Sequence, residues 1–163
     1  VMRPGKLDSP AAATKFALRE LARRHRALDE EVVRFDAELS RLVAKRAPRL
    51  RALVGVGTDV ACALLVTAGD NPDRLRSEAS FAHLCGVSPI PASSGRIHRH
   101  RLNRGGDRSA NQALWRIVMV RMSWDERTRA YAARRTSEGL SKREIIRCLK
   151  RYVAREVYEV LVA

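Results

Sequence analysis

The sequence predicts a mainly α-helical protein, in which a long coiled-coil helix precedes a compact helical domain. Apolar residues first recur at alternating spacings of three and four over a long stretch. Shorter helical segments then follow, bounded by capping residues, glycines and prolines. Hydrophobic residues make up 45% of the 163 residues but aromatic residues only 5%, so we expect a core built from aliphatic side chains.

Changes in periodicity divide the chain into three parts. Residues 1–13 are rich in Pro, Gly and Ala and lack periodicity, so they are predicted to form a linker or a frayed end. Residues 14–47 form the predicted coiled-coil helix, which Pro48 ends. Residues 50–163 form the predicted compact domain. The chain begins Val1-Met2, and we expect further protein before it.

The predicted long helix carries a narrow apolar seam. Seven residues of the seam are apolar and one, His25, is polar. The seam consists of Leu18, Leu21, His25, Leu28, Val32, Phe35, Leu39 and Leu42. This spacing is typical of a coiled coil and continues for about three and a half heptads. A narrow seam suits a partner helix, so we expect a homo-oligomer through residues 14–46. The alternative is that the helix packs against another helix of its own chain.

The net charge of +14 indicates a polyanionic partner, because a small protein with this much self-repulsion is normally neutralised by one. The alternative is a cationic surface that only keeps the protein in solution. No apolar run is long enough to span a membrane. The three cysteines lack the spacing of a metal site and fit a reducing compartment, so we expect a cytoplasmic protein with no metal ligands in this chain.

A glycine-containing turn lies between two helical segments at residues 50–65. In this helix-hairpin-helix pattern, Gly55 and Gly57 permit a tight turn that leaves backbone N–H groups uncovered at Thr58, where the second helix begins. Such donors, together with the helix dipole, can bind a nucleic-acid phosphate without reading the base sequence. The alternative is a purely structural helical hairpin.

Capping residues predict three further helices. Ser77 caps a short helix that ends before Gly86, and Asp107 or Ser109 caps the next one. Ser141 and Glu144 have the spacing of a capping box at the start of the last helix. The segment 125–139 is strongly charged and receives no helix in this prediction.

The loop at residues 87–106 is where chemistry is most plausible. A short β-hairpin is expected here, with residues 96–102 supplying one strand. Ser93 and Ser94 precede Gly95, and a serine that attacks a phosphodiester needs a base and nearby cations. The residues of this region that are expected also to bind DNA are Arg96, His98, Arg99, Arg101, Arg104 and Arg108, and His100 lies among them. The alternative is an ordinary phosphate-binding loop. Asp59, Asp70 and Asp73 lack the spacing of a two-metal site.

Residues 50–120 resemble the transposase domain of insertion-sequence family one-ten. The resemblance depends on the order and spacing of several short motifs. These are the GVG turn, the Gly-Asp turn near residue 70, the FAHLCGVSP helix, the SGR loop, the RGGDR turn and the helix that follows it. The long helix before them matches the coiled coil of that family.

The resemblance implies a two-part recombinase guided by RNA. In that family an N-terminal RuvC-like domain carries acidic DEDD residues that bind Mg²⁺, and the C-terminal domain supplies a serine nucleophile. Ser94 is the better match to that serine, with Ser93 in reserve. The implied partners are DNA and a non-coding guide RNA, and we expect this chain to be inactive without the RuvC-like domain. The alternative function is a non-catalytic helix-hairpin-helix module that binds nucleic acid.

Overall fold

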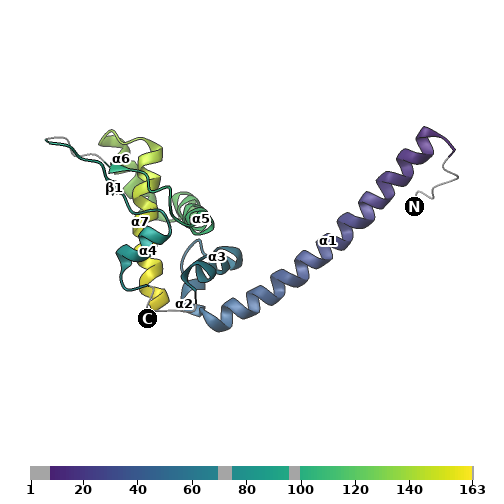
Figure 1. Cartoon of the computed structure of the whole chain (residues 1–163), viewed down its shortest axis with the longest axis horizontal. Helices are drawn as coiled ribbons and strands as arrows, with labels where there is room; N and C mark the ends of the chain where they lie inside the picture. The colour runs from purple at the N-terminus through teal and green to yellow at the C-terminus, as the bar shows by residue number, and fades with distance from the viewer. Residues whose placement is uncertain (1–7, 70–74, 96–99, 163) are drawn as a thin grey trace. The chain divides into compact units, whose positions relative to one another are not determined.

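A computed structural model describes residues 8–69, 75–95 and 100–162. Helices dominate these ranges, and the described residues include one antiparallel pair of two-residue strands (Figure 1). The prediction of a mainly α-helical fold is confirmed. The chain divides into two units, residues 1–41 and 42–163, each of which is described by itself.

The first long helix, α1, spans Pro10–Arg46 and so begins earlier than predicted. The Ser9 hydroxyl accepts a hydrogen bond from the Ala12 N–H at 3.2 Å, and the Ala13 N–H donates to the Ser9 carbonyl. Pro10 follows directly, at a position where a helix needs no N–H donor. Residues 10–13, predicted to belong to a linker, therefore form the first turn of α1.

The apolar seam of α1 is exposed within its own unit. The exposed fraction is 57% for Leu18, 49% for Leu28 and 63% for Phe35. The polar faces carry ion pairs between neighbouring turns, such as Arg41 with Glu38 at 2.8 Å. The length and periodicity of the helix agree with the sequence, and its pairing as a coiled coil remains a prediction.

The second unit is a helical bundle organised around α5 (Arg108–Trp124). This helix packs against α3 (Thr58–Ala68), α6 (Glu126–Ser137) and α7 (Lys142–Val162). The last helix also contacts α2 (Pro48–Arg51) and α4 (Glu78–Leu84). The largest fully buried side chains are Leu50, Leu64, Phe81, Cys85, Leu114, Ile117, Val118 and Val157. As expected, the core is mostly aliphatic.

The predicted caps are present at three helices. The Ser77 hydroxyl accepts from the Ser80 N–H at 3.1 Å, and the Asp107 carboxylate accepts from the Ala110 N–H at 2.7 Å. At α7 the Ser141 N–H donates to Glu144 Oε2 at 2.9 Å, and the Glu144 N–H donates to the Ser141 hydroxyl at 3.4 Å. Of the two residues proposed to cap α5, Asp107 is the one that does so.

The helix α6 was not predicted, because its sequence is dominated by charge and has little apolar periodicity. Its start is fixed by Asp125, which accepts hydrogen bonds from the Thr128 N–H at 2.8 Å and the Thr128 hydroxyl at 2.5 Å. These two bonds lower the pKa of Asp125. The Asp-x-x-Thr spacing was the available sequence signal, and it went unrecognised within a charged run.

Buried and half-buried ion pairs join the helices of this unit. Arg121, 12% exposed at its side chain, binds Glu156 through two hydrogen bonds of 2.5 and 3.2 Å. The Arg121 Nε also donates to the Val54 carbonyl at 2.8 Å, so one guanidinium ties α5 to α7 and to the glycine turn. Glu78 of α4 forms ion pairs with Arg151 and Arg155 of α7.

The cysteines are free thiols. Cys85 is fully buried, and desolvation raises its pKa to about 12, which fits the expected role as a small core residue. None of the helices in the described ranges combines the length and the apolar character that crossing a bilayer requires.

Candidate nucleic-acid interface

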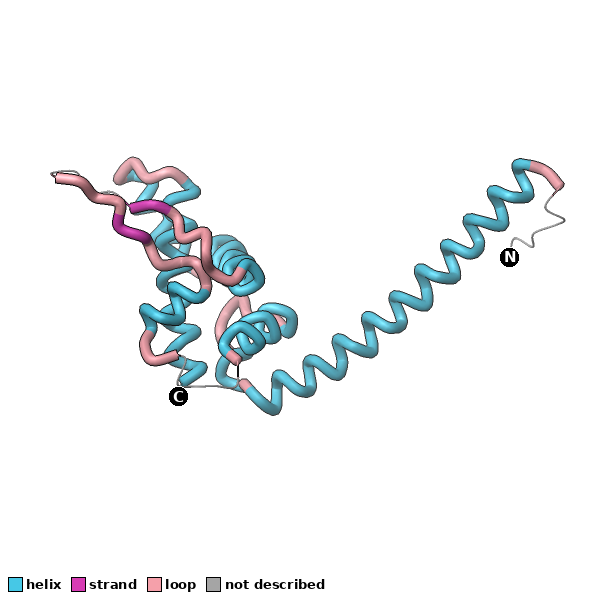
Figure 2. The backbone as a smooth tube through the Cα atoms, viewed as in Figure 1, coloured by secondary structure: helices cyan, strands magenta, loops and turns pink. Residues whose placement is uncertain are grey.

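The predicted hairpin is formed by β1 (Ile90–Pro91) and β2 (His100–Arg101). Ile90 pairs with Arg101 and Pro91 with His100. The strand predicted within residues 96–102 therefore exists at its C-terminal end. Figure 2 shows the two arms leaving the helices side by side. Residues 96–99, and with them the predicted site residues Arg96, His98 and Arg99, lie outside the described residues.

Ser93 and Ser94 follow β1 and are exposed. Gly95 has a φ of 55°, a left-handed conformation that favours glycine because it has no Cβ. In the described part of the chain, the Ser94 hydroxyl has no hydrogen-bond partner. The Ser94 hydroxyl is therefore open to a ligand that approaches the hairpin, and no general base contacts it among the residues that the structure describes.

The base of the hairpin is closed by two glycines in backbone contact. Gly86, with a φ of 66°, ends the turn after α4. A Cβ on Gly106 would lie 2.2 Å from the Gly86 nitrogen and 2.3 Å from its Cα. Any side chain at Gly106 would force the two backbone segments apart. The two glycines thus allow the outgoing and returning arms to meet directly below the strands.

Two asparagines add hydrogen bonds to this closure. The Asn103 Nδ2 donates to the His83 carbonyl at 3.0 Å, and the Asp107 N–H donates to the Leu84 carbonyl at 2.7 Å. Asn111 donates from Nδ2 to the carbonyls of Cys85 at 2.9 Å and Gly86 at 3.2 Å. The C-terminal end of α4 is therefore bound to the returning arm and to the first turns of α5.

Lys150 of α7 reaches the same place. Its Nζ donates to Asn111 Oδ1 at 2.8 Å, which fixes the orientation of the amide that holds the α4 carbonyls. Desolvation lowers the pKa of Lys150, with a smaller effect of the nearby Arg147 charge. The predicted site residues did not include Asn103, Asn111 and Lys150. Each of them makes its hydrogen bond with a residue that is 20 or more positions away in the sequence.

The cations of the described hairpin lie on its returning arm. Arg101 and Arg104 lie there and are exposed, and Arg108, the first residue of α5, is also exposed. His100 is exposed as well, within the strand pair. The structure thus places predicted cationic residues on the same hairpin as the two serines, where a phosphate could be held by arginine.

The glycine turn between α2 and α3 is present, but its two glycines differ. Gly55 has a φ of 84°, and a Cβ there would lie 3.2 Å from the Ile117 carbonyl oxygen of α5. Gly57 is extended, with a φ of −86°, and a Cβ there would meet nothing within 4 Å. Of the two glycines predicted to permit the turn, Gly55 is therefore the one that conformation and packing require.

The start of α3 is open but not purely cationic. Gly57 is the N-cap and provides no side-chain hydrogen bond, so the first donors of the helix, beginning at Thr58, lack a side-chain cap. Asp59 lies in this first turn and forms a 3.9 Å ion pair with Arg116 of α5. Its negative charge already interacts with the positive end of the helix dipole and would repel a second anion. This turn is therefore a weaker anion site.

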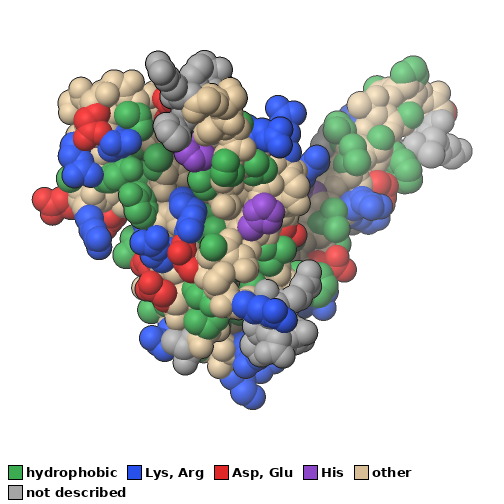
Figure 3. All heavy atoms as spheres, turned by 60° about the vertical axis from the view of Figure 1, so that its left-hand side comes forward, with side chains coloured by type: hydrophobic (Ala, Val, Ile, Leu, Met, Phe, Trp, Pro, Cys, Tyr) green, Lys and Arg blue, Asp and Glu red, His purple; other side chains and the backbone are tan. Residues whose placement is uncertain are grey.

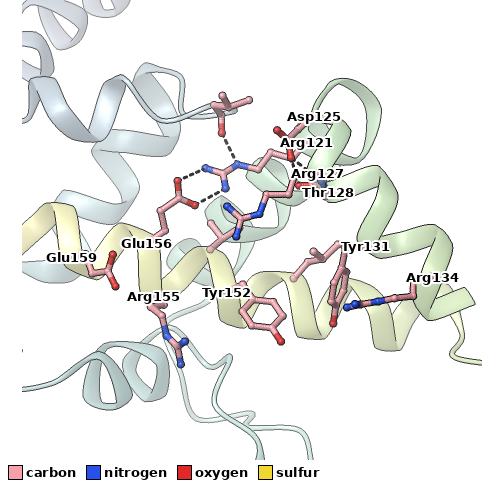
Figure 4. Close-up of a pocket in the computed structure, with 13 residues that line it drawn as sticks. Arg121, Asp125, Arg127, Thr128, Tyr131, Arg134, Tyr152, Arg155, Glu156 and Glu159 are labelled. Carbon is pink, nitrogen blue, oxygen red and sulfur yellow. Dashed lines mark hydrogen bonds and ion pairs between the residues drawn. The ribbon is translucent and has the colours of Figure 1, made fainter. Parts of the chain in front are cut away.

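A depression of about 580 Å³ lies between α5, α6 and α7 (Figure 4). Its wall includes Arg121, Arg127, Tyr131, Tyr152 and Glu159. Tyr131 and Tyr152 form an edge-to-face pair with centroids 5.7 Å apart. Burial raises the pKa of Tyr131 to about 12, so its hydroxyl stays protonated at neutral pH. Sequence reasoning missed this feature because its aromatic residues belong to two helices, one of them unpredicted.

On the face that carries the hairpin, the positive side chains of the second unit do not form one stripe. Figure 3 shows Lys and Arg side chains distributed over the face that carries the hairpin, between apolar patches and a smaller number of acidic side chains. Among the described residues, no group of three or more His, Cys, Asp or Glu side chains is arranged to hold a metal ion. The described part of the chain therefore does not fit a resident Mg²⁺ site.

Comparison of the sequence with known proteins identifies a family. Residues 47–133, more than half of the chain, match the family described as Transposase IS116/IS110/IS902. The chain is also 30% identical over 138 residues to a 43.6 kDa protein of unassigned function from the insertion element IS110 of Streptomyces coelicolor. That alignment covers 83% of this chain but 32% of the relative, so the chain spans about a third of the relative's length. The chain belongs to the IS116/IS110/IS902 transposase family.

Proposed function

We propose that this chain is the part of a transposase that binds nucleic acid and presents Ser94 as the nucleophile for strand cleavage and exchange. The observation that carries the proposal is the hairpin, whose exposed serines lie beyond a closed base. The Gly86–Gly106 contact and the Asn103 and Asn111 hydrogen bonds fix that base on the helices. A nucleophile gains from such support, since its reaction depends on placement.

The proposed step forms a covalent link between protein and DNA. The Ser94 oxygen attacks a phosphodiester phosphorus, its proton passes to a base, and the bond from phosphorus to the 3′ oxygen breaks. The 5′ phosphate remains on the serine and the 3′ oxygen leaves with a proton. Arg101 and Arg104 are suited to stabilise charge on the phosphate oxygens. His100, or His98 outside the described residues, is the candidate for moving the proton.

The remainder of the reaction requires acidic groups that the described residues do not bring together. We propose that a RuvC-like domain of the longer protein supplies acidic residues and Mg²⁺, whose chemistry would be to stabilise the phosphoryl charge. A guide RNA is the proposed source of target recognition. The hairpin and the α3 start offer phosphate contacts, which carry no sequence information.

We also propose that α1 joins copies of the protein through residues 14–46. Its seam is exposed over its whole length, and burial of each Leu-sized side chain would contribute about 1.5–3 kcal/mol. Leu28, Val32 and Phe35, between 49% and 63% exposed, lie near its middle. Paired copies would bring two hairpins to one DNA substrate, as strand exchange requires.

Binding is tested by measuring affinity for a duplex as salt is raised. With several arginine–phosphate contacts, affinity should fall steeply between low and physiological salt and differ little between sequences. Gly57→Val is a probe of the α3 donors, because the position has room for a side chain. It should weaken binding without lowering the melting temperature. A salt-independent affinity would contradict the binding proposal.

The nucleophile is tested in a full-length transposase that carries this domain. Ser94→Ala should abolish cleavage while leaving binding nearly intact, because a hydroxyl is a small part of an arginine-rich surface but is irreplaceable as a nucleophile. Ser93→Ala is the matched control and should still cleave. Normal recombination by Ser94→Ala would reject that serine. Failure of both variants to affect cleavage would favour the alternative function, a non-catalytic module that binds nucleic acid.

A further inference from the structure

We infer that the depression between α5, α6 and α7 holds one unpaired nucleotide, with its base stacked on Tyr152 and its phosphate beside Arg127. This inference rests on the proposed nucleic-acid binding but concerns a different part of the molecule from the hairpin. It assigns the depression to single strands, whereas the proposed phosphate contacts at the hairpin and at α3 are equally suited to duplexes.

The aromatic platform is built from both helices. Tyr152 of α7 is 54% exposed and contacts Tyr131 of α6 at an interplanar angle of 81°. An edge-to-face neighbour can cover at most one face of the Tyr152 ring. The guanidinium of Arg134 lies 5.5 Å from the centroid of Tyr131, which supports that ring from α6. Tyr152 is therefore held by its neighbour and has exposed ring surface on which a base can stack.

Within the described part of the chain, the charges around the platform leave one arginine without a hydrogen bond or ion pair, although its charge interacts with that of Asp125. Of the four guanidinium groups in the wall, Arg121 is occupied by Glu156. Arg155 is paired with Glu78 at 3.5 Å, and Arg134 lies on the Tyr131 ring. Arg127 has no hydrogen bond or ion pair with any residue that the structure describes. Figure 4 shows Arg127 extending from α6 toward α7, beside the Arg121–Glu156 pair.

The carboxylates of the wall determine the orientation of the nucleotide. Glu156 is neutralised by Arg121, and Asp125 is occupied by the N–H and hydroxyl of Thr128. Glu159 lies two helical turns from Tyr152 along α7 and has no ion pair in the described ranges. A phosphate would be repelled from the Glu159 end, so we place it near Arg127 and the base over Tyr152.

A nucleotide fits this set of groups better than a protein segment does. An aromatic face beside a free guanidinium matches a base followed by its phosphate, which is how proteins hold single strands without reading their sequence. The net charge of +14 favours a polyanion over a neutral peptide. A second copy of this chain, itself strongly cationic, would be repelled from an arginine-lined surface.

The experiment measures binding of the whole chain to labelled oligothymidine about ten nucleotides long, a typical single-strand site size. An abasic strand of the same length and a duplex are measured in parallel. Tyr152→Ala should weaken oligothymidine binding about tenfold, within the range for loss of one stacked base. It should leave the abasic strand and the duplex unaffected, and Tyr152→Phe should restore binding. Trp124→Ala, which removes another exposed aromatic residue (83% exposed), is the matched control and should bind normally.

Arg127→Gln tests the phosphate contact. It should weaken binding of both single strands and reduce the salt slope for each by about 0.7, the value for one phosphate contact. Arg129→Gln, an exposed arginine of α6 outside the depression, should leave that slope unchanged.

Three outcomes would overturn the inference. Equal losses for Tyr152→Ala on base-containing and abasic strands would indicate a general structural defect. Normal oligothymidine binding by Tyr152→Ala and Arg127→Gln, with duplex binding intact, would leave the proposed function standing and reject this site. Self-association that depends on Tyr152, without any effect on oligonucleotides, would assign the depression to a second copy. Absence of all nucleic-acid binding by the unmodified chain would instead reject the proposed function together with the site.

Discussion

Two long helices of this protein have similar apolar spacing and opposite surroundings. In α7, Ile145, Leu149, Val153 and Val157 recur every four residues and are at most 6% exposed. In α1, apolar residues recur along the seam at spacings of three and four, and those of the seam remain between 39% and 63% exposed. Periodicity shows that a helix has a face to cover, but it does not reveal which surface covers it. The apolar face of α7 packs against the other helices of the bundle, and we propose that the apolar face of α1 packs against a second copy of the chain.

The largest expected effect is a difference in the free energy of unfolding between a core variant in α7 and a seam variant in α1. Leu149→Ala should lower the free energy of unfolding by about 2–5 kcal/mol, because it leaves a cavity in the core. Leu28→Ala removes the same atoms from an exposed position and should leave the unfolding of the second unit nearly unchanged. Chemical denaturation of both variants measures the difference. Equal destabilisation would show that the α1 seam is packed as firmly as the bundle core.

A charge placed on the α1 seam tests what covers it. Val32→Glu should weaken self-association by about 1.5–3 kcal/mol per altered chain, because it removes one buried apolar side chain and adds a carboxylate. Sedimentation at several protein concentrations measures this change. Val33→Glu, on a neighbouring residue outside the seam and 68% exposed, is the control. Unchanged sedimentation of Val32→Glu would support packing of the helix within its own chain.

Backbone packing within the second unit can be tested with two adjacent glycines. Gly106→Ala should destabilise the protein by about 1–3 kcal/mol, since the new Cβ collides with the Gly86 backbone. A Cβ at Gly105 would lie 3.6 Å from its nearest atom, Asn103 Oδ1, and Gly105→Ala should be close to neutral. Thermal melting of both variants provides the measurement. A neutral Gly106→Ala variant would show that the hairpin base can open without cost to the bundle.

The smallest expected effect concerns the cap of α6. Asp125→Ala should cost about 0.5–2 kcal/mol near neutral pH, as loss of an N-cap does. Hydrogen bonds from Thr128 lower the folded-state pKa of Asp125 below its ordinary value. The cap therefore stabilises the fold fully above an unfolded pKa of about 4 and loses that contribution as pH falls through the folded pKa. The stability difference between the variant and the unmodified protein should shrink over that acidic range, and Glu126→Gln should not reproduce this dependence.

Local signals predicted more of the fold than of the candidate site. The caps at Ser77, Asp107 and Ser141 depend on hydrogen bonds between residues three positions apart, so a short window contains them. The helix α6 was missed because its stability comes from packing against α5 and α7 and not from an apolar stripe of its own. Charge alone gave no reason to expect a helix there.

Part of the candidate site depends on contacts between residues that are far apart in the sequence, so no short stretch of sequence contains them. Ser93, Ser94 and the cations of the hairpin could be found in the sequence, because they are neighbours in one loop. Asn111 and Lys150 could not, since their hydrogen bond joins residues 39 positions apart. The Tyr131–Tyr152 pair has the same origin. The sequence also could not distinguish the two glycines of the α2–α3 turn: Gly55 has a positive φ and Gly57 does not.

The closure at Gly86 and Gly106 makes the hairpin a separable module. The ends of the loop are held together below the strands, so its length can change without changing the distance that the bundle must span. Lengthening such a loop adds only a slowly growing entropy, about 0.6 kcal/mol for each doubling. Related domains could therefore carry longer or shorter hairpins on the same bundle. The reach of the serine toward DNA could then vary independently of the core that supports it.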